Sequence, residues 1–162
     1  MNFLSAANAF LWHGDRLLLM KRASHKRIWP DKFAGVGGKI EAGENPIDAC
    51  YREIEEETGL DRTSITSLKL LYITIRQTDG ELRQNYHFFG TTNSADVVNT
   101  DEGQLMWLDE REIDNLDFVI TAKTVLDHYL SKNRINKILY VATSEIKDGR
   151  LRMNFAKCED FG

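Results

Sequence analysis

The sequence predicts an α+β layered domain built from mostly antiparallel strands and two helices. Three observations support this class: apolar runs flank short turns that contain glycine, two other segments have apolar residues at helical spacing, and no repeat or flexible linker interrupts the chain. A chain of 162 residues is long enough to bury a core of its own. We therefore expect one domain over residues 1–162.

The strands are predicted from apolar segments on either side of polar turns. Asp79-Gly80 is the strongest hairpin feature of the chain, because Asp-Gly favours the tight turns that join antiparallel strands. The expected strands are residues 3–12 and 17–22 around His13-Gly14-Asp15, residues 68–75 and 85–90 around Asp79-Gly80, residues 106–108, and residues 137–143 and 150–155 around Lys147-Asp148-Gly149.

Two helices are expected, over residues 46–58 and 120–129. Asn45 is a good N-cap for the first helix, and Pro46 suits the first helical position. Asp48 complements the helix dipole and can close a pair with the cap. Gly59 can adopt the left-handed conformation that ends a helix, so the first helix is expected to stop near Thr58.

The first helix should carry three distinct faces. At about 100° per residue, its side chains fall into an apolar sector, an acidic sector and a solvated sector. These hold Ile47, Cys50, Tyr51 and Ile54; Glu53, Glu56 and Glu57; and Asp48, Arg52 and Glu55. Carboxylates spaced three and four residues apart repel one another, and a hard divalent cation such as Mg²⁺ would balance their charge. The alternative is an ordinary solvated acidic face.

A glycine-rich segment precedes this helix. Gly35, Gly37, Gly38 and Gly43 crowd residues 35–44, where we expect a tight loop. Glycine is used where the backbone turns sharply or approaches a ligand closely. Such a loop can direct a backbone carbonyl and the side chain of Glu44 toward the acidic face.

The loop and the helix together match a known pattern. Gly38, Glu44 and the run Arg52-Glu53-Ile54-Glu55-Glu56-Glu57-Thr58-Gly59-Leu60 resemble the Nudix box, G-x5-E-x7-R-E-U-x-E-E-x-G-U, at every fixed position. The box covers residues 38–60. Glu102-Gly103 shortly before Trp107 also resembles the family, less specifically.

This resemblance implies a fold and a metal site. Nudix hydrolases share an α/β/α sandwich around a mixed sheet, and they hydrolyse nucleoside diphosphates linked to another group with Mg²⁺ or Mn²⁺. By position, metal ligation would go to Glu53, Glu56, Glu57 and the backbone carbonyl of Gly37. Glu44 would support the cluster, and Arg52 would orient Glu53 or Glu56; the alternative is that Arg52 only balances Glu56.

The resemblance also suggests how the substrate is held and attacked. Lys21 and Arg22 end a strand where the family often places a cation on the substrate phosphates, and Lys39 lies beside the loop glycines. An ordinary pair of strand-end charges is the alternative for Lys21 and Arg22. The general base stays open among Glu53, Glu56, Glu57 and the loop residues Asp101 and Glu102.

The expected reaction is hydrolysis of a nucleoside triphosphate, oxidised or not, to the monophosphate and pyrophosphate. The chain resembles the MutT-like branch that removes oxidised purine nucleotides. Base-reading residues of the mammalian enzyme are replaced here by Ala34 and by Thr121-Ala122, which leaves the base open. Trp29, Tyr86 and Phe88 could stack a base or belong to the core. The alternatives are hydrolysis of a nucleotide sugar, ADP-ribose or a dinucleoside polyphosphate, and a non-catalytic nucleotide-sensing module.

Composition narrows the partners. A formal charge of −4 indicates neither a nucleic-acid polymer nor a membrane surface, so a small nucleotide is the expected ligand. Cys50 and Cys158 lack zinc-ligand spacing, and the first residues resemble neither a signal peptide nor a membrane span. A cytoplasmic protein is expected. Relatives are often dimers, and an apolar edge strand over residues 3–12 would be the contact between two copies.

Overall fold

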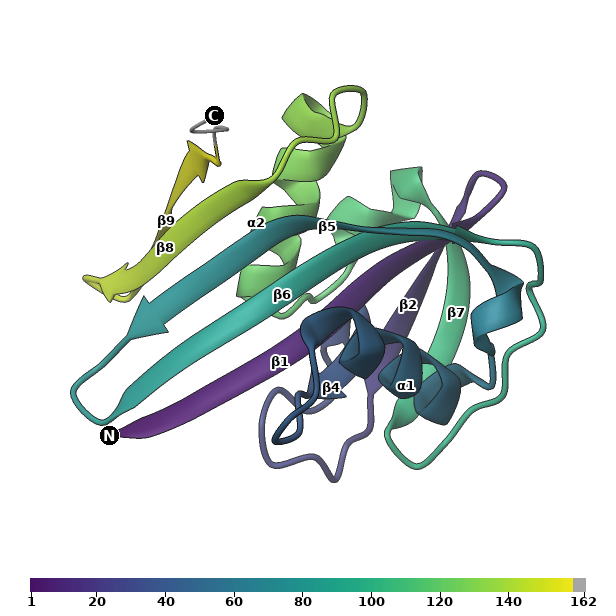
Figure 1. The fold of residues 1–162 in the computed structure, drawn as a ribbon, viewed down its shortest axis with the longest axis horizontal. Coiled ribbons are helices and arrows are strands. Elements are labelled where there is room, and N and C mark those ends of the chain that lie inside the picture. The colour runs from purple at the N-terminus through teal and green to yellow at the C-terminus, as the bar shows by residue number, and fades with distance from the viewer. Residues whose placement is uncertain (159–162) are drawn as a thin grey trace.

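The computed structural model describes residues 1–158, which form one mixed sheet with helices on both faces. The long strands cross the molecule side by side, α1 covers one face, and α2 covers the other (Figure 1). The elements are β1 (Asn2–His13), β2 (Arg16–Arg22), β3 (Phe33–Ala34), β4 (Val36–Lys39), α1 (Pro46–Thr58), β5 (Ile65–Gln77), β6 (Glu81–Thr92), β7 (Gly103–Asp109), α2 (Ile120–His128), β8 (Tyr140–Lys147) and β9 (Arg150–Lys157), with short helical turns at Arg62–Ser64, Glu110–Asn115 and Tyr129–Asn133.

The strand order is β3-β2-β1-β6-β5-β8-β9, with β4 paired to β1 and β7 paired to β2. The pairs β1·β6 and β5·β8 are parallel, and the other pairs are antiparallel. The expected α+β class with a largely antiparallel mixed sheet is confirmed.

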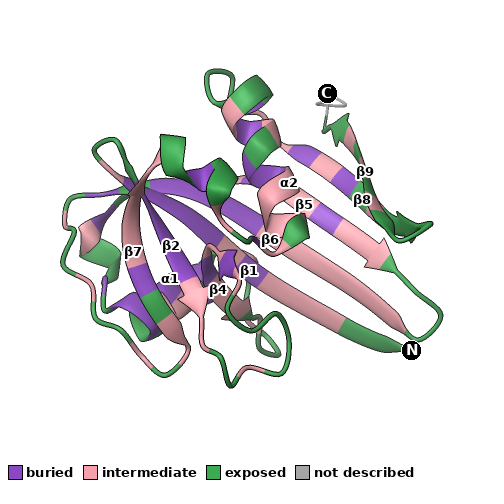
Figure 2. Ribbon diagram, turned by 180° about the vertical axis from the view of Figure 1, so that it is seen from behind, coloured by how far each residue is buried: buried purple, intermediate pink, exposed green. Residues whose placement is uncertain are grey.

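Two hydrophobic cores lie on the two faces of the sheet. Leu11 and Leu18 pack with Ile54 of α1, whereas Phe10 packs with Val125 of α2. Neighbouring residues of a strand point to opposite faces, so a strand buried on both faces is continuously apolar. This explains the continuous apolar runs of residues 9–12 in β1 and 17–20 in β2, which are buried throughout (Figure 2).

The predicted hairpins and helices are confirmed, with two differences. The first is β8, which begins at Tyr140 rather than at residue 137, because Lys137 has a left-handed φ of 50° and its N–H still bonds the carbonyl of Asn133. The second is the segment expected to be a loop over residues 35–44. It is a strand over Val36–Lys39, paired with β1.

The expected edge strand is wrong. β1 pairs along its length with β6, and on its other side with β4 at Ala6–Ala9 and with β2 at Leu11–His13. Its apolar character reflects burial inside the sheet. Most of residues 3–12 therefore lies inside the sheet rather than at its edge, so these residues do not form the free strand edge expected for a contact between two copies.

None of the helices within residues 1–158 combines the length and the apolar character needed to cross a lipid bilayer.

Candidate active site

Helix α1 begins and ends as its sequence predicts. The side chain of Asn45 accepts a hydrogen bond from the N–H of Asp48 at 3.0 Å and donates one to the carboxylate of Asp48 at 2.8 Å. Gly59 has a φ of 81°, and its N–H donates to the carbonyl of Glu55 at 2.9 Å. Both helix ends are thereby satisfied, which fixes the residues at which α1 begins and ends.

The buried face of α1 differs from the predicted one. Ala49, Cys50 and Ile54 are fully buried, whereas Ile47 is 40% exposed. The buried sector is centred near Cys50, which leaves Ile47 at its margin and places Glu57, only 9% exposed, among the buried side chains. The acidic face is therefore partly inside the molecule, which argues against an ordinary solvated surface.

Glu57 is held by the backbone of β4. The N–H of Gly37 donates to a carboxylate oxygen of Glu57 at 2.9 Å. The pKa of Glu57 is raised to about 7, chiefly by burial and also by the nearby charges of Glu53 and Glu102, while the Gly37 N–H and Arg22 oppose the rise. A Cβ added to Gly37 would lie 2.1 Å from the carbonyl oxygen of Ala7, so only glycine lets β4 approach β1 this closely.

Glu53 occupies the space in front of the next glycine. A Cβ on Gly38 would lie 2.5 Å from the carboxyl group of Glu53. Burial raises the pKa of Glu53, and the ion pair with Arg52 opposes this rise. The two adjacent glycines are thus required for different reasons: a side chain on Gly37 would collide with the neighbouring strand β1, and one on Gly38 would collide with the carboxyl group of Glu53.

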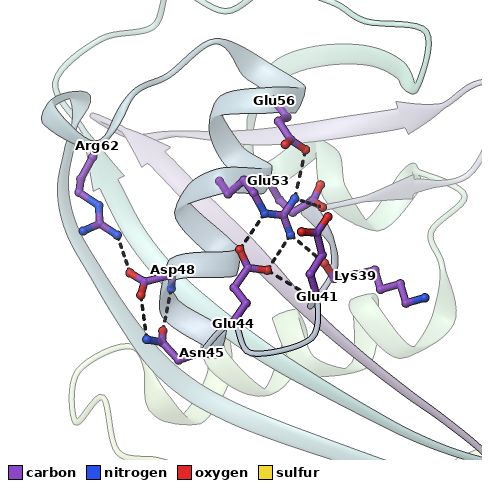
Figure 3. Close-up of polar contacts among 9 residues, drawn as sticks. Lys39, Glu41, Glu44, Asn45, Asp48, Glu53, Glu56 and Arg62 are labelled. Carbon is purple, nitrogen blue, oxygen red and sulfur yellow. Dashed lines mark hydrogen bonds and ion pairs between the residues drawn. The ribbon is translucent and has the colours of Figure 1, made fainter.

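Arg52 joins the glycine segment to the helix. It makes a bidentate contact with Glu44, at 2.8 Å from Nε and 2.8 Å from a terminal nitrogen, and donates to Glu53 at 2.8 Å and Glu56 at 3.2 Å (Figure 3). It also donates to the carbonyl of Lys39 at 3.0 Å. Arg52 holds the pKa of Glu44 down at about 2. The placement of Arg52 on the solvated face is therefore wrong, because the segment that carries Glu44 folds over it.

The acidic face opens into a hollow of about 490 Å³. We call it the carboxylate hollow. Residues from β2, β4, α1 and the segment before β7 line it: Arg22, Gly37, Gly38, Lys39, Glu53, Glu56, Glu57, Thr100, Asp101 and Glu102. The structure thus brings together most of the site residues expected from the sequence, including both loop candidates for the general base.

Three of the expected residues lie elsewhere. Glu44 and Arg52 stand behind the hollow, where Arg52 connects Glu44 to the lining carboxylates. Lys21 is absent from the lining residues, because it precedes Arg22 in β2 and neighbouring strand residues point to opposite faces. The geometry therefore gives no support to Lys21 as a phosphate ligand.

The carboxylate and carbonyl oxygens of the carboxylate hollow are of the kind that binds a divalent metal, although they do not point toward one common position. Within residues 1–158, no three His, Cys, Asp or Glu side chains are arranged to hold an ion. Glu53 is directed toward Arg52, and Glu57 toward the N–H of Gly37. The acids nevertheless outnumber the lining cations Arg22 and Lys39, and carboxylate oxygens are the donors that Mg²⁺ prefers.

A second hollow lies on the face of the sheet that α2 covers in part. We call it the sheet-face pocket; its volume is about 260 Å³. Its lining residues are Ala6, Asn8, Phe10, Arg22, Ile28, Trp29, Ala34, Gly35, Arg83, Asn85, His87, Val119, Thr121 and Ala122. Arg22 lines both hollows, so the two adjoin.

Sequence analysis missed the polar floor of this pocket. Asn85 and His87 alternate with Tyr86 and Phe88 along β6, a period-two pattern that marks one polar and one apolar face. Among the aromatic candidates, Trp29 is 38% exposed and lines the pocket, while Tyr86 and Phe88 pack into the core on the α1 side. Base stacking thus remains open for Trp29 alone.

The buried end of the floor is neutral. His87 is 4% exposed, its Nε2 lies 2.9 Å from the hydroxyl of Thr74, and burial lowers its pKa to about 4. At neutral pH the ring is therefore uncharged, and within residues 1–158 no hydrogen bond involves its other nitrogen, Nδ1.

A comparison with models of protein families identifies the family to which this fold and site belong. The model of the NUDIX domain matches residues 2–141 of the chain. The protein belongs to the Nudix family. It is accordingly a Nudix hydrolase, an enzyme class that acts on acid anhydrides and generally uses a divalent metal.

Individual relatives agree with this assignment. The chain is 28% identical over 123 residues to the uncharacterized Nudix hydrolase YvcI of Bacillus subtilis, covering 74% of this chain and 75% of YvcI. It is 33% identical over 110 residues to the nucleoside triphosphatase NudI of an Enterobacter species, covering 62% of this chain and 77% of NudI. The crystal structure of a MutT protein from Bacillus halodurans superposes with a TM-score of 0.74 at 22% identity, covering 93% of this chain and 97% of that one. The Nudix-type sandwich is confirmed.

Proposed function

We propose that this Nudix hydrolase cleaves a nucleoside triphosphate to the monophosphate and pyrophosphate in a reaction that requires Mg²⁺. One observation carries the proposal: an acidic, metal-suited hollow adjoins a pocket of nucleoside size, and Arg22 lies between them. A triphosphate placed across Arg22 would have its anhydride linkage in the carboxylate hollow and its nucleoside on the sheet. The name of NudI, a nucleoside triphosphatase, supports the same substrate class.

Glu53, Glu56, Glu57 and the carbonyl of Gly37 would hold the metal, because they line one hollow and supply only oxygen donors. When bound, Mg²⁺ neutralises phosphate oxygens and lowers the pKa of a bound water. Arg52 would fix the orientation of Glu53 and Glu56 by binding one carboxylate oxygen of each, since it already contacts both and is itself held by Glu44.

The substrate phosphates would lie against Arg22 and Lys39, the cations of the hollow. Their charges attract the polyphosphate and leave the anhydride facing the acids. The oxygen of water then bonds to one phosphorus of the linkage, the bridging oxygen departs with the other phosphate, and the proton of the water passes to a carboxylate. Glu53, Glu56, Glu57, Asp101 and Glu102 all line the hollow and are the candidates for that base.

The nucleoside would rest on the sheet-face pocket. Asn85 and His87 offer hydrogen-bonding groups on its floor, and Trp29 provides an aromatic wall. Ala34, Thr121 and Ala122 line the same pocket and are small or neutral, so the base is read by the sheet rather than by carboxylates.

A product screen tests the proposal. The protein with Mg²⁺ is offered the nucleoside triphosphates, oxidised purine triphosphates, nucleotide sugars, ADP-ribose and dinucleoside polyphosphates, and products are separated by ion chromatography. We expect monophosphate and pyrophosphate in equal amounts from at least one triphosphate, with no release in EDTA. Turnover of only one of the other compound classes would show that this class, and not the triphosphates, is the substrate. No turnover of any compound would favour a nucleotide sensor.

A further inference from the structure

A third hollow continues the sheet-face pocket away from the metal side. We call it the arginine hollow. Its lining residues are Trp29, Thr74, Arg76, Arg83, Asn85, Thr121 and Ser144, of which Trp29, Arg83, Asn85 and Thr121 also line the sheet-face pocket. Its volume of about 40 Å³ has room for a few water molecules or one phosphate group, and none for a second nucleoside.

Two arginines face each other in this hollow. Arg76 of β5 pairs directly with Arg83 of β6 in the sheet register. Like charges opposite one another destabilise a strand pair. Arg83 is balanced in part by Glu81, at 3.0 Å, whereas Arg76 makes no ion pair within residues 1–158. One guanidinium therefore lines the hollow without a counter-charge.

Apart from Glu81, which pairs with Arg83, no acid within the described residues supplies a counter-charge from the lining of the two pockets. The chain has 25 Asp and Glu residues, yet among residues 1–158 none of them lines the sheet-face pocket or the arginine hollow. A further hollow beside β1 is lined by Lys39 and Arg83 and again by no acid of the described chain. Cationic side chains thus run across the sheet from Lys39, at the carboxylate hollow, to Arg76.

The two ends of this run are well separated. Lys39 lies on β4 and Arg76 on β5, and the strands between them follow the order β4-β1-β6-β5. At roughly 4.8 Å per strand, their backbones are about 14 Å apart. Among the described residues, the carboxylate hollow and the arginine hollow share no lining residue, so a diphosphate held in the first does not occupy the second. An anion at Arg76 would therefore be a separate group of the ligand.

We propose that the arginine hollow binds a second phosphate of the substrate, carried on the ribose of the nucleotide whose anhydride lies in the carboxylate hollow. Thr74, Asn85 and Ser144 would add neutral hydrogen bonds, and the paired guanidinium groups match the geometry of phosphate oxygens. The inference rests on the proposed placement of the nucleotide, and it predicts a preference for nucleoside 5′-triphosphates that also carry a 2′- or 3′-phosphate.

Binding without metal tests the arginine hollow independently of hydrolysis. Calorimetry in EDTA compares AMP and GMP with their 2′,5′- and 3′,5′-bisphosphates. We expect at least one bisphosphate to bind tenfold or more tightly than its monophosphate, and Arg76→Gln to remove that advantage. The 2′ and 3′ arms identify which ribose phosphate is recognised. Equal affinity for every pair, or no binding of any of them, overturns the proposal.

Turnover separates this inference from the proposed function. With Mg²⁺, kcat/KM is compared for ATP and for GTP against the same 5′-triphosphate carrying the added ribose phosphate that calorimetry selects. We expect a ratio of at least ten for one pair, falling toward one in Arg76→Gln through KM. Hydrolysis with a ratio of one in both pairs contradicts the second phosphate site and leaves the hydrolase assignment standing.

The matched control is Arg152→Gln. Arg152 is an exposed arginine of β9 on the same sheet, and it lines none of the hollows described here. The variant removes the same charge from the molecule as Arg76→Gln. We expect it to keep the phosphate preference of the unaltered protein, and an equal loss in both variants would show that only the overall charge matters and would overturn the proposal.

Discussion

The carboxylate hollow and the sheet-face pocket adjoin each other but are built in opposite ways. Most of the first comes from contiguous chain, the segment of residues 37–57 that contains β4 and α1. The second gathers Asn8 from β1, His87 from β6 and Thr121 from α2, residues far apart in sequence. The contrast teaches that the groups expected to do chemistry are fixed by local spacing, whereas the groups expected to choose the substrate depend on which strands become neighbours.

The two regions also differ in how they satisfy polar groups. In the carboxylate hollow, one guanidinium, Arg52, is shared among Glu44, Glu53 and Glu56. On the floor of the sheet-face pocket, the uncharged ring of His87 bonds to the hydroxyl of Thr74. Charge removal should therefore damage the first region through turnover, and changes in shape or protonation should damage the second through binding or stability.

The largest expected effect is on turnover when a lining carboxylate is neutralised. Glu57→Gln should lower Mg²⁺-dependent turnover by about 10³-fold while the fold is kept, because the amide preserves shape and loses the negative charge. Glu55→Gln on the exposed side of α1 is the matched control and should leave turnover unchanged. Phosphate release and circular dichroism measure the two properties. Undiminished turnover in Glu57→Gln would remove Glu57 from the site.

Acidity should affect the two regions with opposite sign in the metal-free protein. Burial lowers the pKa of His87 to about 4 from 6.5, so its contribution to stability is complete above pH 6.5 and is lost as the pH falls toward 4. Burial raises the pKa of Glu57 to about 7 from 4.5, so its contribution is complete below pH 4.5 and is lost as the pH rises through 7.

Two non-titrating variants separate these contributions. His87→Gln should lessen the acid-induced loss of unfolding free energy between pH 6.5 and 4, by up to about 3 kcal/mol. Glu57→Gln should lessen the loss between pH 4.5 and 7. Urea unfolding in EDTA across this range measures both. Identical pH profiles for the unaltered protein and either variant would contradict the corresponding shift.

Loss of the shared guanidinium should have an intermediate effect. Arg52→Gln is expected to lower turnover by about 10- to 100-fold, because Glu53 and Glu56 lose the group that orients them. Arg52→Lys should not restore it, since an ammonium cannot make the bidentate contact with Glu44. Arg62→Gln is the control. Arg62 is an exposed arginine just after α1, and it forms an ion pair with Asp48 of that helix. A full rescue by lysine would mean that only charge is needed.

The smallest expected effect lies on the floor of the sheet-face pocket. Asn85→Ala should raise KM about tenfold with little change in kcat, because it removes hydrogen bonds made equally in the ground and transition states. Steady-state kinetics on the best substrate from the product screen measures this split. A fall in kcat with an unchanged KM would place Asn85 in the chemical step instead.

Much of the fold could be predicted from the sequence because capping and turn residues indicate where its helices and hairpins begin and end. The caps Asn45 and Gly59 fixed the ends of α1, and Asp79-Gly80 marked the hairpin of β5 and β6. The strand β4 escaped prediction, since Gly37 and Gly38 have low strand propensity. Their reason is tertiary: the Cβ positions of the two glycines are occupied by the carbonyl of Ala7 and the carboxyl group of Glu53.

By itself, the sequence determined the acids, their helical phase and the helix ends, because these depend on residues within a few turns of one another. The Nudix pattern is contained in residues 38–60, which is why the family was readable. The tertiary structure alone decided that Glu57 is buried, that Arg52 is enclosed by Glu44, and that Asp101 and Glu102 join the carboxylate hollow. It also decided that Arg76 faces Arg83, because strand register depends on pairing between distant segments rather than on local sequence.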